Sequence, residues 1–159
     1  MAIYDCFQFH NEETVLDLRF NILNKYIDFF VVVESSTDHQ GNKKKLNFNI
    51  QNYKEFEKKI IYILVDDVKD NIKKPHIGQN SLIEQYQRNA ISRGLKNCKD
   101  NDLIIISDVD EIPNLKEINL KDLKDKFIFF NQEMFYYKFN LKLPNHNWVG
   151  TRCCKKKYL

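Results

Sequence analysis

Hydrophobic residues along the chain gather into short runs that alternate with longer amphipathic stretches. The runs have the length and the β-branched content of strands, and several contain no polar position, as expected for strands buried on both faces of a sheet. The predicted strands cover residues 3–9, 29–33, 59–65, 102–106, 126–130 and 134–143.

Two amphipathic stretches predict helices between these strands. The first covers residues 13–26, where apolar residues recur at steps of three and four and predict one buried stripe, formed by Val15, Leu18, Ile22 and Tyr26. The second covers residues 81–95 and begins with a capping box, Ser81 to Glu84. Its expected apolar positions are Leu82, Tyr86 and Ala90.

Strands that alternate with helices predict an α/β fold, with a mostly parallel central sheet flanked by helices on both faces. In such sheets ligands bind at the carboxyl ends of the strands. Three acidic residues follow predicted strands and are expected at that edge: Glu34, Asp66 and Asp108. We expect one domain over residues 1–152 and a basic tail over residues 153–159.

Composition narrows the class of protein. Apolar residues make up 43% of the chain, which is typical of a globular domain. The net charge of +3 arises from 25 basic and 22 acidic residues that are mixed along the sequence, so charge alone predicts no nucleic-acid partner. The lysine run 43–45 could meet an anionic ligand, and the four cysteines have no metal-binding spacing and are expected to be reduced thiols.

No apolar run approaches the roughly 18 residues that span a bilayer, and the N-terminus lacks the pattern of a signal peptide. The sequence therefore predicts no transmembrane segment and a cytoplasmic location. It is compatible with a homo-oligomer.

The strongest chemical signal is the segment 103–113, LIIISDVDEIP. A buried strand here delivers Asp108, Asp110 and Glu111 to one place. Carboxylates this close repel one another unless a cation or a proton offsets their charge, and hard oxygen ligands suit Mg²⁺ or Mn²⁺. The alternative is that these acids form a solvated turn.

Two other metal motifs fit less well. An EF-hand loop that begins at Asp108 would need glycine where Pro113 stands and an oxygen donor where Ile112 stands. A metal-dependent phosphatase of the aspartyl-phosphate class would need threonine at Ile112 and a nucleophile on the first strand. The phosphatase stays open as a weaker hypothesis.

Taken together, the motifs resemble glycosyltransferase family 17, whose best-known members are bisecting β-1,4-N-acetylglucosaminyltransferases. The similarity covers most of the chain. It includes Glu13, Asp17 and Arg19, the segment IDFFVVVESST with Gly41 and Leu46 after it, and the segments EQYQRNAISRGL and IIISDVDEIP.

The resemblance implies a GT-A (Rossmann-like) nucleotide-diphospho-sugar transferase fold. It also implies a UDP-sugar donor, carrying N-acetylglucosamine, and a hydroxyl acceptor on a glycan or a lipid-linked molecule. Asp108 and Asp110 would hold Mn²⁺ or Mg²⁺. The residues that would contact the donor are Asn11, Glu13, Glu34, Arg88 and Asp108.

Two of these residues have simpler explanations that stay open. Arg88 follows Glu84 by four residues, so a surface ion pair could account for it. Glu34 could cap a neighbouring helix. Asp17 and Arg19 cannot share one helix face, so a salt bridge between them is not expected.

Catalysis depends on a base that the sequence identifies poorly. Inverting transfer needs a carboxylate near the acceptor hydroxyl, and the nearby candidates are Glu111 and Glu133. The family's catalytic domain is longer than this chain, and its later half usually supplies the acceptor contacts. A nucleotide-sugar-binding module without activity of its own is therefore an alternative. Known animal members are membrane-anchored Golgi proteins, and the absence of an anchor favours a bacterial or viral member.

Overall fold

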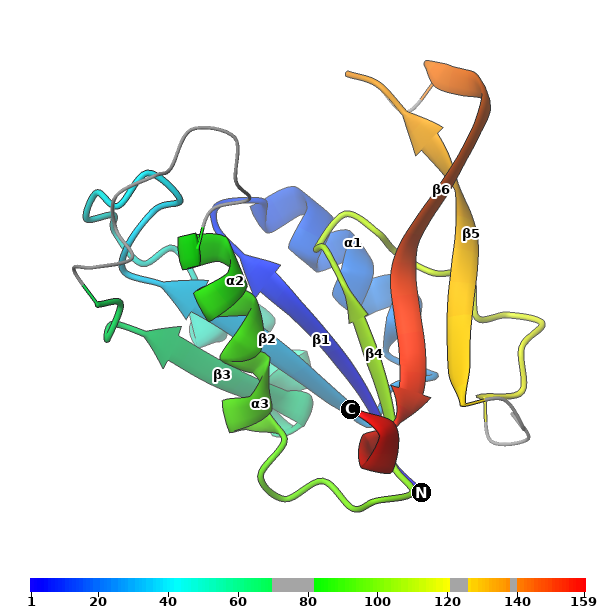
Figure 1. The fold of residues 1–159 in the computed structure, drawn as a ribbon, viewed down its shortest axis with the longest axis horizontal. Coiled ribbons are helices and arrows are strands. Elements are labelled where there is room, and N and C mark those ends of the chain that lie inside the picture. The colour runs from blue at the N-terminus through cyan, green and yellow to red at the C-terminus, as the bar shows by residue number, and fades with distance from the viewer. Residues whose placement is uncertain (70–81, 121–125, 138–139) are drawn as a thin grey trace.

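A computed structural model describes residues 1–69, 82–120, 126–137 and 140–159 of the protein. Six strands form one sheet in the order β3-β2-β1-β4-β6-β5 (Figure 1). Their bounds are Ile3–Phe9 (β1), Phe29–Ser35 (β2), Ile60–Val65 (β3), Leu103–Ser107 (β4), Phe127–Phe135 (β5) and Lys142–Lys155 (β6). Strands β1 to β4 are parallel, whereas β6 is antiparallel to β4 and β5 is antiparallel to β6. The expected α/β class is confirmed, but the sheet is mixed.

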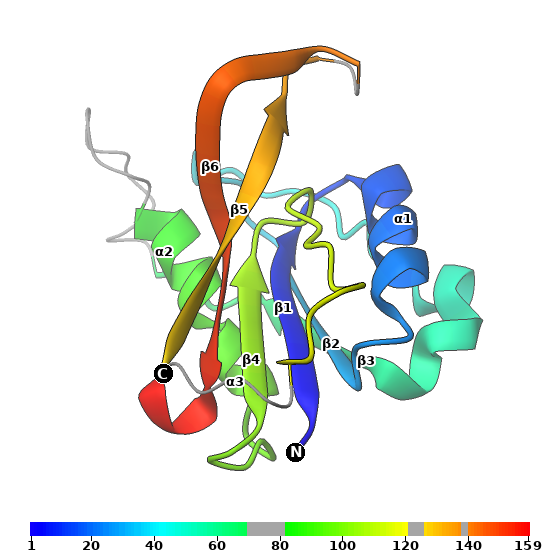
Figure 2. The same cartoon turned by 90° about the vertical axis from the view of Figure 1, so that its right-hand side faces the viewer.

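Helices cover both faces of the parallel part of the sheet (Figure 2). Helix α1 (Glu13–Leu23) and the 3-10 segment η1 (Ile50–Lys59), which the sequence pattern did not predict, pack on one face. Helices α2 (Leu82–Asn89) and α3 (Ile91–Gly94) pack on the other. A short 3-10 turn, η4 (Lys156–Tyr158), follows β6. The described helices include none that is long and apolar enough to cross a membrane.

The buried face of α1 differs from the predicted stripe. The helix buries Leu16, Arg19, Phe20 and Leu23, whereas Leu18 and Ile22 are 41% and 46% exposed. The prediction was wrong because it treated Arg19 as a surface residue, although this side chain is fully buried beside Asp5 on β1. Asp17 and Arg19 are not paired with each other, as expected.

The second predicted helix is two short helices, with Ala90 between α2 and α3. Of the predicted apolar positions, Ala90 is buried and Tyr86 packs against the core, whereas Leu82 is exposed. The buried face also includes Ile83 and Gln87, which were not predicted. Buried Gln87 donates to the carbonyl of Thr37 at 2.9 Å, which explains a polar residue on the inner face. The predicted capping residue Ser81 lies outside the described residues.

The last two strands form a long hairpin that rises beyond the edge of the sheet (Figures 1 and 2). The predicted strand 134–143 is wrong, because β5 ends at Phe135 and β6 begins at Lys142. Tyr137 has a left-handed backbone (φ 59°), which a continuous strand cannot adopt. Strand β6 then continues through buried Cys153 and Cys154, beyond residue 152 where a tail was expected to begin.

The strand order positions the site. From β1 the chain adds β2 and β3 on one side, and it then crosses to place β4 on the other side of β1. The carboxyl ends of β1 and β4 therefore form a topological switch point, where α/β sheets bind ligands in the crevice between diverging connections.

Candidate functional site

A pocket of about 260 Å³ lies at this switch point. It is lined by residues from the carboxyl ends of β1, β2 and β4, from the loop after β2 and from α2, which include Gln8, His10, Glu12, Ser35, His39, Lys44, Gln87, Arg88, Asp108 and Asp110. We call this the small pocket. Its lining combines acidic and basic groups.

The segment after β4 brings both predicted metal-binding residues to the small pocket. Asp108 and Asp110 line it on either side of Val109. The Val109 side chain is buried in the core, whereas the Asp108 side chain is 50% exposed and Asp110 is exposed. Burial of the middle residue thus leaves the two carboxylates at the surface of the pocket.

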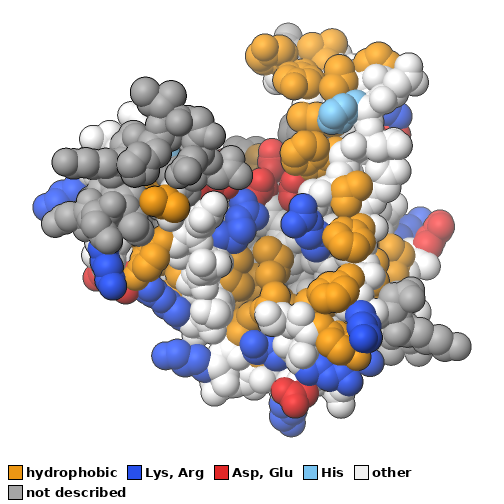
Figure 3. All heavy atoms as spheres, in the orientation of Figure 1, with side chains coloured by type: hydrophobic (Ala, Val, Ile, Leu, Met, Phe, Trp, Pro, Cys, Tyr) orange, Lys and Arg blue, Asp and Glu red, His pale blue; other side chains and the backbone are white. Residues whose placement is uncertain are grey.

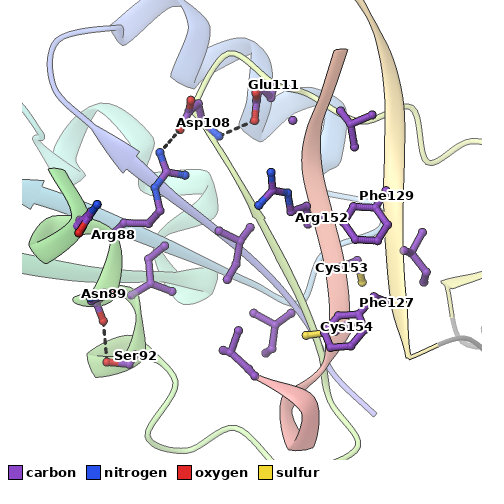
Figure 4. Close-up of a pocket in the computed structure, with 18 of the residues that line it drawn as sticks. Arg88, Asn89, Ser92, Asp108, Glu111, Phe127, Phe129, Arg152, Cys153 and Cys154 are labelled. Atoms are coloured by element: carbon purple, nitrogen blue, oxygen red, sulfur yellow. Dashed lines mark hydrogen bonds and ion pairs between the residues drawn. The ribbon is translucent and has the colours of Figure 1, made fainter. Parts of the chain in front are cut away.

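Arg88 connects α2 to this segment. Its Nη2 donates to Oδ1 of Asp108 at 2.8 Å (Figure 4). The same nitrogen donates to Oε1 of Glu84 at 3.3 Å. The ion pair within the helix is therefore present, and Arg88 also contacts the segment after β4. Burial alone would lower the pKa of Arg88, but its two carboxylate partners outweigh burial and raise the pKa. The guanidinium stays charged.

Glu34 is buried at the end of β2, and the protein's own donors occupy its carboxylate. Oε1 accepts from Lys44 Nζ at 2.8 Å and from the amide of Asn47 at 2.7 Å. Oε2 accepts from the hydroxyl of Tyr62 at 2.9 Å and from the amide of Phe48 at 3.1 Å. Burial alone would raise the pKa of Glu34, yet these hydrogen bonds lower it. A contact with a nucleotide would have to displace one of these donors.

The turn before α1 meets the small pocket through other residues than the sequence suggested. His10 and Glu12 line the pocket, whereas Asn11 and Glu13 do not. Oε2 of Glu12 accepts from the amides of His10 at 2.9 Å and Asn11 at 3.0 Å, which holds the turn in shape. Asn11 is exposed in this turn, and Glu13 is exposed on the first turn of α1.

A second pocket, of about 1230 Å³, adjoins the first and shares Glu84, Arg88 and Asp108 with it. We call it the large pocket. It lies between α2, α3 and the β5–β6 hairpin, and residues of β4 also line it (Figure 3). Its lining is largely apolar and includes Ile104, Ile106, Phe127, Phe129 and Cys154. Arg152 on β6 lies across this pocket from Arg88 (Figure 4).

Glu111 lines the large pocket but not the small one. Oε2 accepts from the amide of Asp108 at 2.9 Å, and Oε1 accepts from Nε1 of Trp148 at 2.5 Å. Gly150 leaves room for this arrangement, because a Cβ there would lie 1.9 Å from Oε1 of Glu111. The hairpin therefore holds the Glu111 carboxylate beside Asp108.

Glu133, the other predicted base, lies elsewhere. It is on the exposed part of β5, forms an ion pair with Lys142 and lines neither pocket. The structure therefore brings only Glu111 of the two candidates next to the acids that follow β4.

The side chains at the end of β4 have the chemistry to bind a divalent cation. Asp108 and Asp110 offer carboxylate oxygens, which Mg²⁺ and Mn²⁺ prefer. The described part of the chain contains no cluster of three or more His, Cys, Asp or Glu side chains that could hold a metal alone. The two carboxylates fit a cation that takes its other ligands from water and from substrate phosphates, which is a common arrangement for Mg²⁺.

Sequence reasoning missed several residues of the small pocket. His39 contacts Oε1 of Gln87 through Nε2 at 3.2 Å, and both residues line the pocket. The lysine run was noted for its charge, and the structure places its central residue, Lys44, on the pocket. Gln87 sits one turn from Ile83 on α2, so a helical reading that allowed a buried polar residue could have found it.

The four cysteines are free thiols, as expected. Burial raises the pKa of Cys153 to about 12 and that of Cys98 to about 11, so neither is a thiolate at neutral pH.

Comparison with known proteins identifies relatives of the chain. The chain is 26% identical over 159 residues to a β-1,4-mannosyl-glycoprotein 4-β-N-acetylglucosaminyltransferase of Rattus norvegicus, and 27% identical over 152 residues to the protein of that name in Homo sapiens. These matches cover 95% and 91% of this chain but only 29% and 28% of the relatives, so the chain spans less than a third of their length.

No solved structure gives a significant match to the chain. A model of the family described as glycosyltransferase family 17 matches residues 1–158, which is nearly the whole sequence. The chain belongs to glycosyltransferase family 17.

Proposed function

We propose that the protein transfers a sugar, N-acetylglucosamine, from a UDP-sugar to a hydroxyl group of a glycan or lipid-linked acceptor, with inversion at the anomeric carbon. The observation that carries this proposal is the pair of carboxylates, Asp108 and Asp110, at the β1/β4 switch point in a chain of this family. The strand order β3-β2-β1-β4 supports a GT-A type of fold.

We assign the donor to the small pocket and the acceptor to the large one. The small pocket lies at the carboxyl ends of the parallel strands and carries the cations Lys44 and Arg88 together with the two aspartates, which suits a diphosphate and a metal. The large pocket adjoins it at Asp108 and offers apolar and aromatic walls. Because the two pockets meet at Arg88 and Asp108, an acceptor in the large pocket could reach the sugar of a donor that is bound in the small pocket.

In this arrangement an acceptor hydroxyl attacks the anomeric carbon from the large pocket. Its oxygen forms the new bond to carbon as the bond to the diphosphate oxygen breaks, and Glu111 takes the proton. Arg88 offsets the negative charge that develops on the departing UDP. A bound Mn²⁺ or Mg²⁺ would add to this neutralisation as a Lewis acid. The role of Glu111 is supported by its place beside Asp108 on the large pocket.

The test is release of UDP from UDP-N-acetylglucosamine with and without Mn²⁺, for the wild type and for Asp110→Asn. Asp66→Asn is a matched control, because Asp66 is an exposed acid that follows β3 at the same edge of the sheet and lines neither pocket. We expect metal-dependent release that Asp110→Asn abolishes and Asp66→Asn retains. Normal release by Asp110→Asn would contradict the proposal.

One observation favours a second candidate, a module that binds nucleotide sugars without turnover. Both oxygens of Glu111 accept hydrogen bonds within the protein, and Glu133 is paired with Lys142. This candidate predicts binding of UDP-N-acetylglucosamine by calorimetry with no release of UDP. Hydrolysis or transfer by the isolated chain would reject it.

A further inference from the structure

Arg19 is the largest side chain that the described core buries completely, and its charge is held by Asp5. Nε donates to Oδ2 of Asp5 at 2.8 Å and Nη2 donates to Oδ1 at 2.6 Å. Its guanidinium also lies over the ring of Phe7, with Cζ 4.6 Å from the ring centre. Burial of a charge is costly unless it is paired and hydrogen-bonded, so this contact joins α1 firmly to β1.

The other donors of Arg19 are directed at the segment after β4. Nη2 donates to Oγ of Ser107 at 2.6 Å. Nη1 donates to three backbone carbonyls, those of Asp108 at 2.9 Å, Val109 at 3.1 Å and Glu111 at 3.2 Å. A guanidinium has five N–H donors in a rigid plane, and here all its nitrogens bind either Asp5 or residues 107–111.

We propose that Arg19 is a positioning residue, which holds the backbone of residues 108–111 so that Asp108 and Asp110 face the small pocket before a ligand binds. The proposal rests on the metal and donor site proposed above. Three backbone carbonyls of the segment accept hydrogen bonds from Arg19. The Val109 side chain, between the two acids, is buried in the core. These contacts fix the backbone of the segment on its buried side.

A role in fold stability alone explains these contacts less well. A buried ion pair can often be replaced by apolar residues with no loss of stability, so the Asp5–Arg19 pair is not needed to fill the core. The donor Nη1 contacts no group of Asp5 and serves only the three carbonyls after β4. Replacement of a residue that orients metal ligands through hydrogen bonds typically lowers the metal affinity about 10- to 100-fold.

The variant Arg19→Lys keeps the charge beside Asp5 but loses the planar fork that reaches several carbonyls at once. We expect the dissociation constant for Mn²⁺ in the presence of UDP to rise about 10- to 100-fold. The Mn²⁺ concentration for half-maximal UDP release should rise in parallel, while kcat at saturating Mn²⁺ falls less. Both are measured at a temperature where circular dichroism shows every variant to be folded.

Leu23→Ala is the control for lost stability, because Leu23 is buried on the same helix as Arg19 but has an apolar side chain, which cannot donate hydrogen bonds to the carbonyls of residues 108–111. It should lower the melting temperature and leave the Mn²⁺ dissociation constant unchanged. Wild-type affinity in Arg19→Lys, or an equal loss in Leu23→Ala, would overturn the proposal.

A second measurement uses the wild type without ligand. The amide of Glu111 donates to the carbonyl of Asp108 and that of Ile112 to Asp110, each at 3.1 Å. If Arg19 orders this segment in advance, these amides should be protected from hydrogen exchange to a degree comparable with β4. Exchange at the rate of an unstructured peptide would overturn the proposal even if Arg19→Lys does not fold. Failure of the wild type to bind Mn²⁺ and UDP would instead count against the proposed function.

Discussion

Arg88 on α2 and Asp108 after β4 lie side by side at the edge of the sheet, with Nη2 2.8 Å from Oδ1. Their side chains are 38% and 50% exposed, so the ion pair stabilises the fold by only about 0.2–1 kcal/mol. The contact lies where the two pockets meet. Its main consequence should therefore be seen in ligand binding and turnover.

Arg88→Gln tests this expectation. We predict that kcat for UDP release falls by a factor on the order of 100, since a cation beside the developing charge is lost, while the free energy of unfolding changes by less than about 1 kcal/mol. Arg93→Gln is the matched control, because Arg93 pairs with Asp67 on the surface and lines neither pocket. Equal kcat values for Arg88→Gln and Arg93→Gln would show that Arg88 has no specific role in UDP release.

Gly150→Ala should displace the Glu111 carboxylate. The new Cβ would lie 1.9 Å from Oε1 of Glu111 and 2.5 Å from Nε1 of Trp148. The Glu111 carboxylate can move because it ends a flexible side chain, but its hydrogen bond with Trp148 would be lost, so we expect a moderate fall in melting temperature. Transfer to the acceptor should fall strongly, whereas the dissociation constant for UDP with Mn²⁺ should stay near that of the wild type. Unchanged transfer would argue against Glu111 as the base.

The Glu34 network predicts a pH-dependent contribution to stability. Hydrogen bonds from Lys44, Asn47, Phe48 and Tyr62 outweigh burial and hold the pKa of Glu34 below its ordinary value of 4.5. A lowered pKa in the folded state stabilises the protein above the ordinary pKa, and this stabilisation is lost as the pH falls through the folded pKa. Glu34→Gln should lower the free energy of unfolding by about 1.5–3 kcal/mol at neutral pH.

Chemical denaturation between pH 3 and pH 7 measures the free energy of unfolding of the wild type and of Glu34→Gln. The difference between these two free energies should become smaller below about pH 4.5. Glu55→Gln serves as a control, since Glu55 is exposed on η1 and should give no difference at any pH. A gap that widens on acidification would contradict the assignment of Glu34 as an ionised, buried acceptor.

The parallel strands and the acids that follow them were predictable because both depend on local sequence. The run LIIIS has no polar interruption before its last residue, and the acids come directly after it, so the edge that carries Asp108 and Asp110 follows from the pattern. The residues of the turn before α1 that line the small pocket were not predictable. Nothing in the local sequence distinguishes Asn11 from Glu12, and only the folded turn shows which of them faces the pocket.

Helix faces were misread where a polar side chain is buried. Arg19 and Gln87 look like surface residues in a helical pattern, and the residues that bury them, Asp5 and Thr37, are distant in sequence. Strand β6 was missed for a related reason. Most of its residues are polar and exposed, and its backbone is held by pairing with β4 and β5 rather than by local preference.

The central claim is that Asp108 and Asp110 bind a divalent cation together with the donor diphosphate. The most direct test is the melting temperature of the wild type, Asp108→Asn and Asp110→Asn with UDP, with Mn²⁺ and with both. A ligand present at a hundredfold its dissociation constant adds about 2.7 kcal/mol to stability. We predict that UDP and Mn²⁺ together stabilise the wild type by about this amount, more than the sum of their separate effects, and stabilise neither variant. Equal stabilisation of all three proteins would contradict the claim.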